Sequence, residues 1–235
     1  MYKTRCSSIG LIMTNARSKK EKLSQTAKNH IREVLIQNKF GKYKDFSNRY
    51  TDKGNEVESN GIYLCNEVLN LELLYKNHDS FENDYITGTP DINTSDILID
   101  IKSSWNAFTY FENFFSEKIT NKNYMYQLQG YMWLTGKKVS RLCYCLLDTP
   151  EQIVEDEVRR EHWKHKAIDE NPEIREYIEN NHSFENIPKE LRVKTFIIEY
   201  DENIIEEIKQ RVEECREYYN ELNELLTIKE VENVR

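Results

Sequence analysis

The segment "GTPDINTSDILIDIKSSW", residues 88–105, places one aspartate directly after a proline and a second aspartate two residues ahead of a lysine. Its second half alternates as a strand does, so Asp100 and Lys102 share one face and the isoleucines point to the other. Asp91 precedes a short turn and can fold back toward Asp100. Two carboxylates held close together repel each other unless a proton or a cation lies between them. Because their oxygens are hard ligands, the segment favours a Mg²⁺ or Mn²⁺ site.

A plainer interpretation is an ion pair between the aspartate and the lysine at a sheet edge, with the first aspartate capping a turn. Two other segments favour a catalytic site over this structural ion pair. Glu58 falls on the apolar stripe of a predicted helix, and a carboxylate that points at the core needs a partner. Gln127 and Tyr131 are four residues apart on one helical face, where an amide and a phenol can brace a lysine or a phosphate.

Length and composition favour a single helix-rich α/β domain. The chain has 235 residues, 38 % of them apolar and 31 % charged, with only 7 glycines and 4 prolines. It contains no apolar run of roughly 20 residues and no secretory signal pattern at its start, so we expect a cytoplasmic protein without a membrane partner. Its 5 cysteines form no C-x-x-C pair, which favours reduced thiols and predicts no iron–sulfur cluster.

Charge is distributed unevenly along the chain. The net charge is −8, yet residues 1–53 contain 13 Lys and Arg against 4 Asp and Glu, a net of about +9. This basic segment is either a solvated helix or a positive surface for phosphates, beside an acidic body that supplies metal ligands.

Hydrophobic periodicity predicts an alternation of helices and strands. Residues 38–54 are expected to form a polar loop, and residues 85–88 and 97–102 a hairpin around "NTSD". The predicted helices span about 20–37, 55–76, 123–135 and 202–226, and the other predicted strands span 139–147 and 191–201. We divide the single domain into a basic segment 1–53, a core of about 54–150, an accessory helical segment of about 151–190 and a strand and helix at about 191–235.

Together, five short motifs resemble the PD-(D/E)XK nuclease superfamily, and within it the phage lambda exonuclease and YqaJ-like recombinases. Each motif alone is weak, but they follow one another in the order of that superfamily across roughly residues 5–150. They are "RCSSIGLIMT" near the N-terminus, "GNEVE" at 54–58, Pro90-Asp91, Asp100-Ile101-Lys102 and "QLQGY" at 127–131. The second acidic position is aspartate where glutamate is commoner, and the segment after Pro150 has no counterpart.

The resemblance implies an α/β, restriction-endonuclease-like fold with a mixed central sheet flanked by helices, an extra helical segment and a long C-terminal helix. It also implies roles for individual residues. Mg²⁺, with Mn²⁺ able to substitute, would be held by Glu58, Asp91, Asp100 and the Ile101 carbonyl. Lys102 would orient the attacking water, and Gln127 and Tyr131 would position that lysine or the DNA backbone.

A terminal 5′-phosphate would be bound by Arg5, Ser7 and Ser8. The alternative for these three residues is a helix cap beside a surface arginine.

The function implied by the resemblance is a metal-dependent exonuclease that hydrolyses duplex DNA from its ends in the 5′-to-3′ direction, in phage-type recombination or DNA processing. Its expected partners are DNA ends, a single-strand annealing protein and further copies of itself, a trimer by resemblance. One alternative is a structure- or site-specific endonuclease, Cas4-like or resolvase-like, and another is a catalytically silent DNA-binding module. An aromatic cluster at Trp105, Phe108, Tyr110 and Phe111 could stack on bases or belong to the core.

Overall fold

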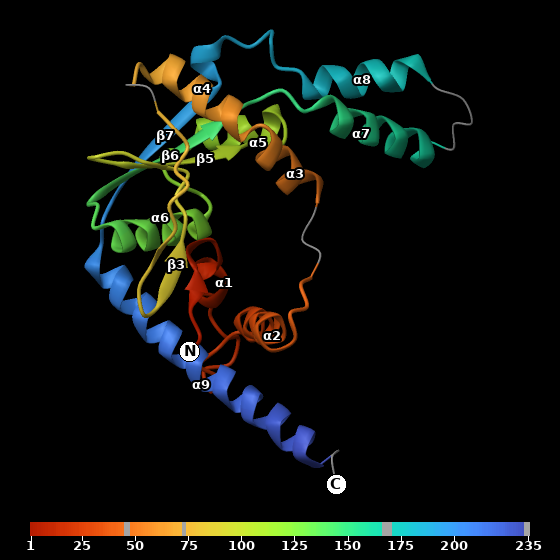
Figure 1. Cartoon of the computed structure of the whole chain (residues 1–235). Helices are drawn as coiled ribbons and strands as arrows, with labels where there is room; N and C mark the ends of the chain where they lie inside the picture. Colours follow the sequence, from red (N-terminus) through yellow and green to blue (C-terminus); the bar gives the residue numbers. More distant parts are fainter. Residues whose placement is uncertain (45–47, 72–73, 166–170, 233–235) are drawn as a thin grey trace.

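The computed structural model describes residues 1–44, 48–71, 74–165 and 171–232. These residues form two sheets with helices packed around them (Figure 1). The larger sheet has the strand order β4 (Ile92–Asn93), β5 (Leu98–Ser103), β6 (Val139–Cys145) and β7 (Val193–Glu199). Strands β5 and β6 run parallel, whereas both outer pairs run antiparallel. The mixed sheet predicted for this fold class is therefore confirmed.

The smaller sheet shows that the predicted hairpin was assigned the wrong strand. Strand β3 (Ile86–Gly88) pairs with β1 (Thr4–Arg5) and β2 (Phe81–Glu82) instead of with β5. The partner of β5 across the "NTSD" turn is β4, where Thr94 N donates to the Ile97 carbonyl (3.1 Å). Because β4 has only two residues, it is too short to show an alternating pattern in the sequence.

Helices cover both faces of the larger sheet. Helix α4 (Glu58–Leu69) packs on the face that carries Ile99 and Ile101. Helices α6 (Lys122–Thr135) and α9 (Glu202–Glu232) belong to the cluster on the opposite face, with Leu98. The alternation predicted for β5 is thus confirmed, and Asp100 and Lys102 lie on the face toward α6.

Two helices near the N-terminus are fixed by their caps. Helix α2 (Gln25–Phe40) begins at Ser24, whose hydroxyl accepts from Ala27 N, and ends at Gly41 with φ 61°. Helix α3 (Arg49–Glu56) lies where a loop was expected. Its start is a capping box between Asn48 and Thr51, and because the helix is polar it has no apolar stripe for the sequence to reveal.

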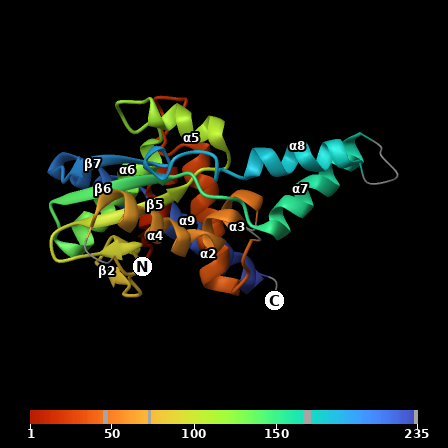
Figure 2. The same ribbon diagram turned by 90° about the horizontal axis from the view of Figure 1, so that it is seen from above.

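The accessory segment forms a helical hairpin that projects from the body of the molecule in both views (Figures 1 and 2). It consists of α7 (Glu151–Lys164) and α8 (Pro172–His182). His162 joins them, since its Nδ1 contacts the Val158 carbonyl (2.7 Å) and its Nε2 accepts from Asn171 N (2.6 Å). Few side chains of the hairpin are buried, so polar contacts contribute much of its cohesion.

The remaining short elements are α1 (Ile9–Ile12), α5 (Ala107–Phe114) and two 3₁₀ turns, Cys6–Ser8 and Lys189–Leu191. Helix α5 contains most of the aromatic cluster, and its members differ: Tyr110 is fully buried, whereas Phe108 is 80 % exposed. Across the described ranges, no helix combines the length and apolarity needed to cross a bilayer.

Candidate active site

Strand β5 places an acid and a base side by side at the centre of the candidate site. Asp100 is only 1 % exposed, and its Oδ2 lies 2.7 Å from the Lys102 Nζ. The two residues are one step apart on the same strand face, as the alternation predicted. This arrangement keeps an ammonium and a carboxylate together where the sheet meets α6.

Asp91 folds back onto the same strand. It follows Pro90 at the end of the smaller sheet, and its Oδ2 accepts a hydrogen bond from Ile101 N (2.9 Å). Asn77 braces this turn by donating from its backbone to the Asp91 carbonyl (2.7 Å) and from its side chain to the Pro90 carbonyl (3.0 Å). This bond places Asp91 beside β5, where the charge of Asp100 acts on it.

Burial and the neighbouring acid change the ionisation of this group. Burial, together with the charge of Asp100, raises the pKa of Asp91 to about 7. For Lys102, burial alone would lower the pKa, but Asp100 and Asp91 together raise it above its ordinary value. The lysine is thus a cation at neutral pH, while Asp91 is only partly ionised there, and a nearby cation could replace its proton.

Helix α6 supplies the polar groups that face these carboxylates. The Gln127 amide donates to Asp100 Oδ1 (3.3 Å) and to the Tyr131 hydroxyl (3.0 Å). Burial and then Asp100 raise the pKa of Tyr131, so the phenol keeps its proton. The pair predicted from the Q-x-x-x-Y spacing therefore does meet the acidic residues of β5.

Glu58 lies at the start of α4, at the edge of this group. Its Oε2 pairs with the Lys76 Nζ (2.6 Å), and its charge contributes to the raised pKa of Asp91. Helix α4 approaches β5 closely because Gly61 has no side chain: a Cβ there would lie 2.9 Å from Ile101 Cγ2. Among the described residues, no three His, Cys, Asp or Glu side chains are already gathered as a metal cluster.

Asp91, Asp100 and Lys102, with Gln127 and Tyr131 facing them, are called the acidic group below. A pocket of about 460 Å³ adjoins this group and shares Tyr131 with it. Two of the three residues predicted to hold a 5′-phosphate, Arg5 and Ser7, line this pocket, whereas Ser8 does not. The full lining is Arg5, Cys6, Ser7, Ser80, Thr87, Gly88, Thr89 and Tyr131. A guanidinium and several hydroxyls suit the oxygens of a phosphate.

The hydroxyls of Ser80, Thr87 and Thr89 were missed by the sequence analysis. Only Thr89 had a signal in the sequence, because it directly precedes Pro90-Asp91. Ser80 and Thr87 reach the pocket through the pairing of β2 with β3, which the sequence did not predict.

The mixed sheet, the D-x-K strand and the facing Gln and Tyr on α6 define a nuclease of the PD-(D/E)XK class. Comparison with solved structures identifies the family within this class. The crystal structure of a phage-related exonuclease from Haemophilus somnus 129PT is 32 % identical in sequence, with a TM-score of 0.78 over 96 % of each chain. This chain belongs to that family of phage-related, lambda-exonuclease-like enzymes.

The alkaline exonuclease LHK-Exo from Laribacter hongkongensis shares the fold. Its structure matches with a TM-score of 0.68 and 17 % identity, over 98 % of this chain and 94 % of that chain. The complex of LHK-Exo with dAMP matches with a TM-score of 0.65 and 18 % identity over the same shares. No sequence profile of a known family matches the chain, and neither does any curated protein sequence.

Proposed function

We propose that this chain is a metal-dependent deoxyribonuclease that removes nucleotides from the ends of duplex DNA in the 5′-to-3′ direction, leaving single strands for recombination. The observation that carries the proposal is the junction at Tyr131 of the acidic group on β5 and the pocket of hydroxyls around Arg5. The acidic group suits phosphodiester hydrolysis, and the pocket around Arg5 suits a terminal phosphate. The dAMP bound by LHK-Exo supports DNA as the substrate.

The residues of the acidic group fit a divalent cation. Asp100 Oδ2 is buried and, within the described residues, accepts no well-aligned hydrogen bond, although the Lys102 ammonium lies 2.7 Å away. Asp91 has a pKa of about 7, so it releases its proton readily to a competing cation near neutral pH. The ligands would be Glu58, Asp91, Asp100 and the Ile101 carbonyl, once the Glu58 carboxylate exchanges Lys76 for the metal.

When bound, Mg²⁺ would lower the pKa of a coordinated water and neutralise charge on the scissile phosphate. The protein supplies the orientation. Lys102, a cation held against Asp100, would orient the water and stabilise the charge that develops in the transition state. Gln127 fixes Asp100 and Tyr131 relative to each other, so the strand and α6 form one rigid frame.

The pocket would set the direction of cleavage. Arg5, Ser7 and the threonine hydroxyls would bind the 5′-phosphate of the strand end, which leaves the first phosphodiester near the acidic group. An end without this phosphate would forfeit the charge-assisted contacts and enter the site in a less defined register.

The first experiment compares a linear duplex carrying a 5′-phosphate at one end with the matching closed circle, each with Mg²⁺ and with EDTA. We expect metal-dependent loss of the linear DNA alone, and a label on each strand gives the polarity. Cutting of the circle would replace the proposal by an endonuclease of the same fold. Binding without cutting of either substrate would indicate the catalytically silent module.

A further inference from the structure

Lys53 is a cation buried inside the protein, outside the acidic group. It lies on α3 with 1 % of its surface exposed, and its Nζ donates to the Trp105 carbonyl (3.0 Å). The ammonium also lies 5.8 Å from the centre of the Trp105 ring and 5.3 Å from that of Phe184. Within the described part of the chain, the carboxylate that acts on it is Asp148, through a charge interaction without a hydrogen bond.

This position is costly for a lysine. Burial lowers the pKa of Lys53 to about 8, and the more distant Asp148 offsets only part of that effect. A methionine would fill a similar volume without charge, but it would leave the Trp105 carbonyl without its hydrogen bond. The hydrogen bond from the ammonium to the Trp105 carbonyl is therefore what a lysine provides here and a methionine cannot.

Lys53 connects the end of the catalytic strand with the helix that carries Glu58. On one side, Ser104 N donates to the Cys145 carbonyl (2.9 Å) as the chain leaves β5, and the next carbonyl, that of Trp105, is held by Lys53. On the other side, the Lys53 carbonyl accepts from Val57 N (3.0 Å), the residue directly before α4. The Lys53 side chain thus holds the segment after β5, and its backbone carbonyl holds the residue before α4.

We infer that Lys53 is a positioning residue of the nuclease site, whose ammonium holds the Trp105 carbonyl and thereby sets the end of β5 against α4. This inference rests on the proposed function. Lys53 is too deeply buried to touch DNA, so its effect is on turnover and not on substrate binding.

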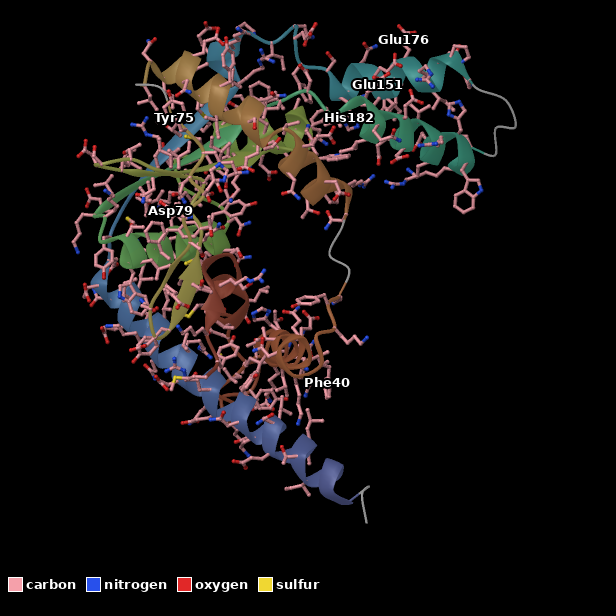
Figure 3. All side chains as sticks on the ribbon, viewed as in Figure 1. Phe40, Tyr75, Asp79, Glu151, Glu176 and His182 are labelled. Atoms are coloured by element: carbon pink, nitrogen blue, oxygen red, sulfur yellow. The ribbon has the colours of Figure 1, made fainter. Side chains whose placement is uncertain are left out.

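The base of the accessory hairpin packs on the same tryptophan. The Trp105 ring meets the His182 ring edge-on at 5.1 Å, and His182 is labelled at this junction in Figure 3. The Arg49 guanidinium lies over Trp105 (5.1 Å) and pairs with Glu157 of α7 (2.6 Å). Movement of Trp105 would therefore also disturb the attachment of α7 and α8.

The charged groups around Lys53 are Asp148, His182, Arg49 and, beyond them, Glu157. Burial, and then the charge of Lys53, lower the pKa of His182 from its ordinary value. His182 is consequently neutral where Lys53 titrates, and the charge that changes at this junction near pH 8 is that of Lys53.

The test compares wild type with Lys53→Met, Lys53→Arg and the exposed control Lys118→Met, measuring kcat and KM on linear duplex between pH 6.5 and 9.5. For wild type we expect kcat to fall as pH rises through about 8. Lys53→Met should lower kcat at least about tenfold at pH 7.5 with KM within about twofold, and should lack this alkaline limb. Lys53→Arg, which keeps its charge, should restore part of kcat and also lack the limb. A Lys53→Met enzyme with wild-type kcat and an unchanged limb would overturn the inference.

A second measurement does not depend on nuclease activity. The indole NMR signal of Trp105 should titrate near pH 8 in wild type, should not do so in Lys53→Met, and should be unaffected by Lys118→Met. If Trp105 titrates but wild type cuts no DNA, the proposed function fails and the positioning role fails with it. If wild type cuts DNA but Trp105 does not titrate, only the inference about Lys53 fails.

Discussion

At the scale of single residues, the site is organised by the competition of two carboxylates for positive charge. Asp100 already has the Lys102 ammonium 2.7 Å away, whereas Asp91 accepts a hydrogen bond from the Ile101 N–H and burial raises its pKa to about 7. The two acids therefore differ in role although they are the same amino acid. Substitutions at each should have different consequences.

Replacing Asp100 by Asn should abolish cleavage, with kcat falling at least about a hundredfold, because it would remove a proposed metal ligand and the partner of Lys102. Duplex binding, measured by fluorescence anisotropy in EDTA, should change little. The matched control is Asp96→Asn, an exposed aspartate in the turn before β5. Metal-dependent activity in Asp100→Asn would refute the assignment of this residue.

Asp91 should give stability a pH dependence in the absence of metal. Its folded-state pKa, about 7, exceeds its ordinary value, so the folded protein binds more protons than the unfolded chain between about pH 4 and 7. Stability should fall as pH rises through this window, by about 1–3 kcal/mol. Urea unfolding in EDTA should show the fall in wild type and not in Asp91→Asn, and equal slopes in both proteins would contradict the prediction.

Arg5 should discriminate between chemically different DNA ends. Arg5→Ala should slow degradation of 5′-phosphorylated duplex by about 10- to 100-fold, because a charge-assisted contact of about 1.5–3 kcal/mol is lost. The rate on a 5′-hydroxyl end should change little, which a parallel time course measures. Arg17→Ala, at an exposed arginine of the same basic segment, serves as the control.

At the scale of elements, the distance between α4 and β5 decides where Glu58 lies. A Cβ on Gly61 would lie 2.9 Å from Ile101 Cγ2 and 3.4 Å from Leu147 Cδ1. Neither neighbour is free to move, because both belong to the core on that face of the sheet. Gly61 thus allows the close approach of α4 to β5, and the added methyl group of an alanine tests this role.

Gly61→Ala should lower the free energy of unfolding by about 1–3 kcal/mol through overpacking, and should lower activity by displacing α4 with Glu58. Gly54→Ala is the matched control, since a Cβ there meets nothing within 4 Å on helix α3. That variant should gain up to about 1 kcal/mol from helix propensity. Chemical denaturation compares both, and equal effects would contradict the spacing argument.

The sequence predicted those elements whose pattern repeats over several residues. Helix α6 was located almost to the residue, because an apolar stripe runs into Gly136 with φ 73°. Helix α3 was missed because its stability comes from a capping box rather than from apolar periodicity. Strand β4 is two residues long, and the pairing of β3 with β1 joins segments about 80 residues apart, which no local pattern encodes.

The same distinction, between local sequence patterns and long-range pairing, applies to the residues of the candidate site. The strand pattern predicted Asp100 beside Lys102, and the helical spacing predicted Gln127 and Tyr131 on one face. That the helix pair would face the strand was implied by the family resemblance, and the structure has Gln127 bonded to Asp100. Ser80 and Thr87 were not predicted, because their approach to Arg5 depends on the smaller sheet. Lys53 gave no signal either, since a lysine in a polar helix is ordinarily solvated.

At the scale of the whole molecule, charge is segregated along the chain: residues 1–53 are basic within a protein of net charge −8. This segment contains β1 and α2, and it contributes Arg5, Cys6 and Ser7 to the pocket. An acidic body beside it would repel duplex placed elsewhere. The annealing-protein partner and the trimer implied by the resemblance stay predictions.

This segregation should appear in the salt dependence of binding. Replacing Lys19 and Lys20 by Gln should reduce the slope of log K against log salt by about 1–2, because each phosphate contact contributes about 0.9. The same double change at Lys164 and Lys189, which already pair with Glu161 and Glu67, should leave the slope unchanged. Anisotropy titrations between 50 and 300 mM salt, roughly the range where such slopes are linear, measure both.

Helix α9 holds the beginning of the chain against its end. Arg216 Nε donates to the Tyr2 carbonyl (3.1 Å), and the Tyr2 and Tyr219 rings lie 5.6 Å apart. Tyr2 leads directly into β1, whose Arg5 lines the pocket. Tyr2 and Arg216 are 214 residues apart in the sequence, so their contact forms only after both segments have been synthesised. The proposed grip of Arg5 on a DNA end would therefore become available only after this long-range contact has formed.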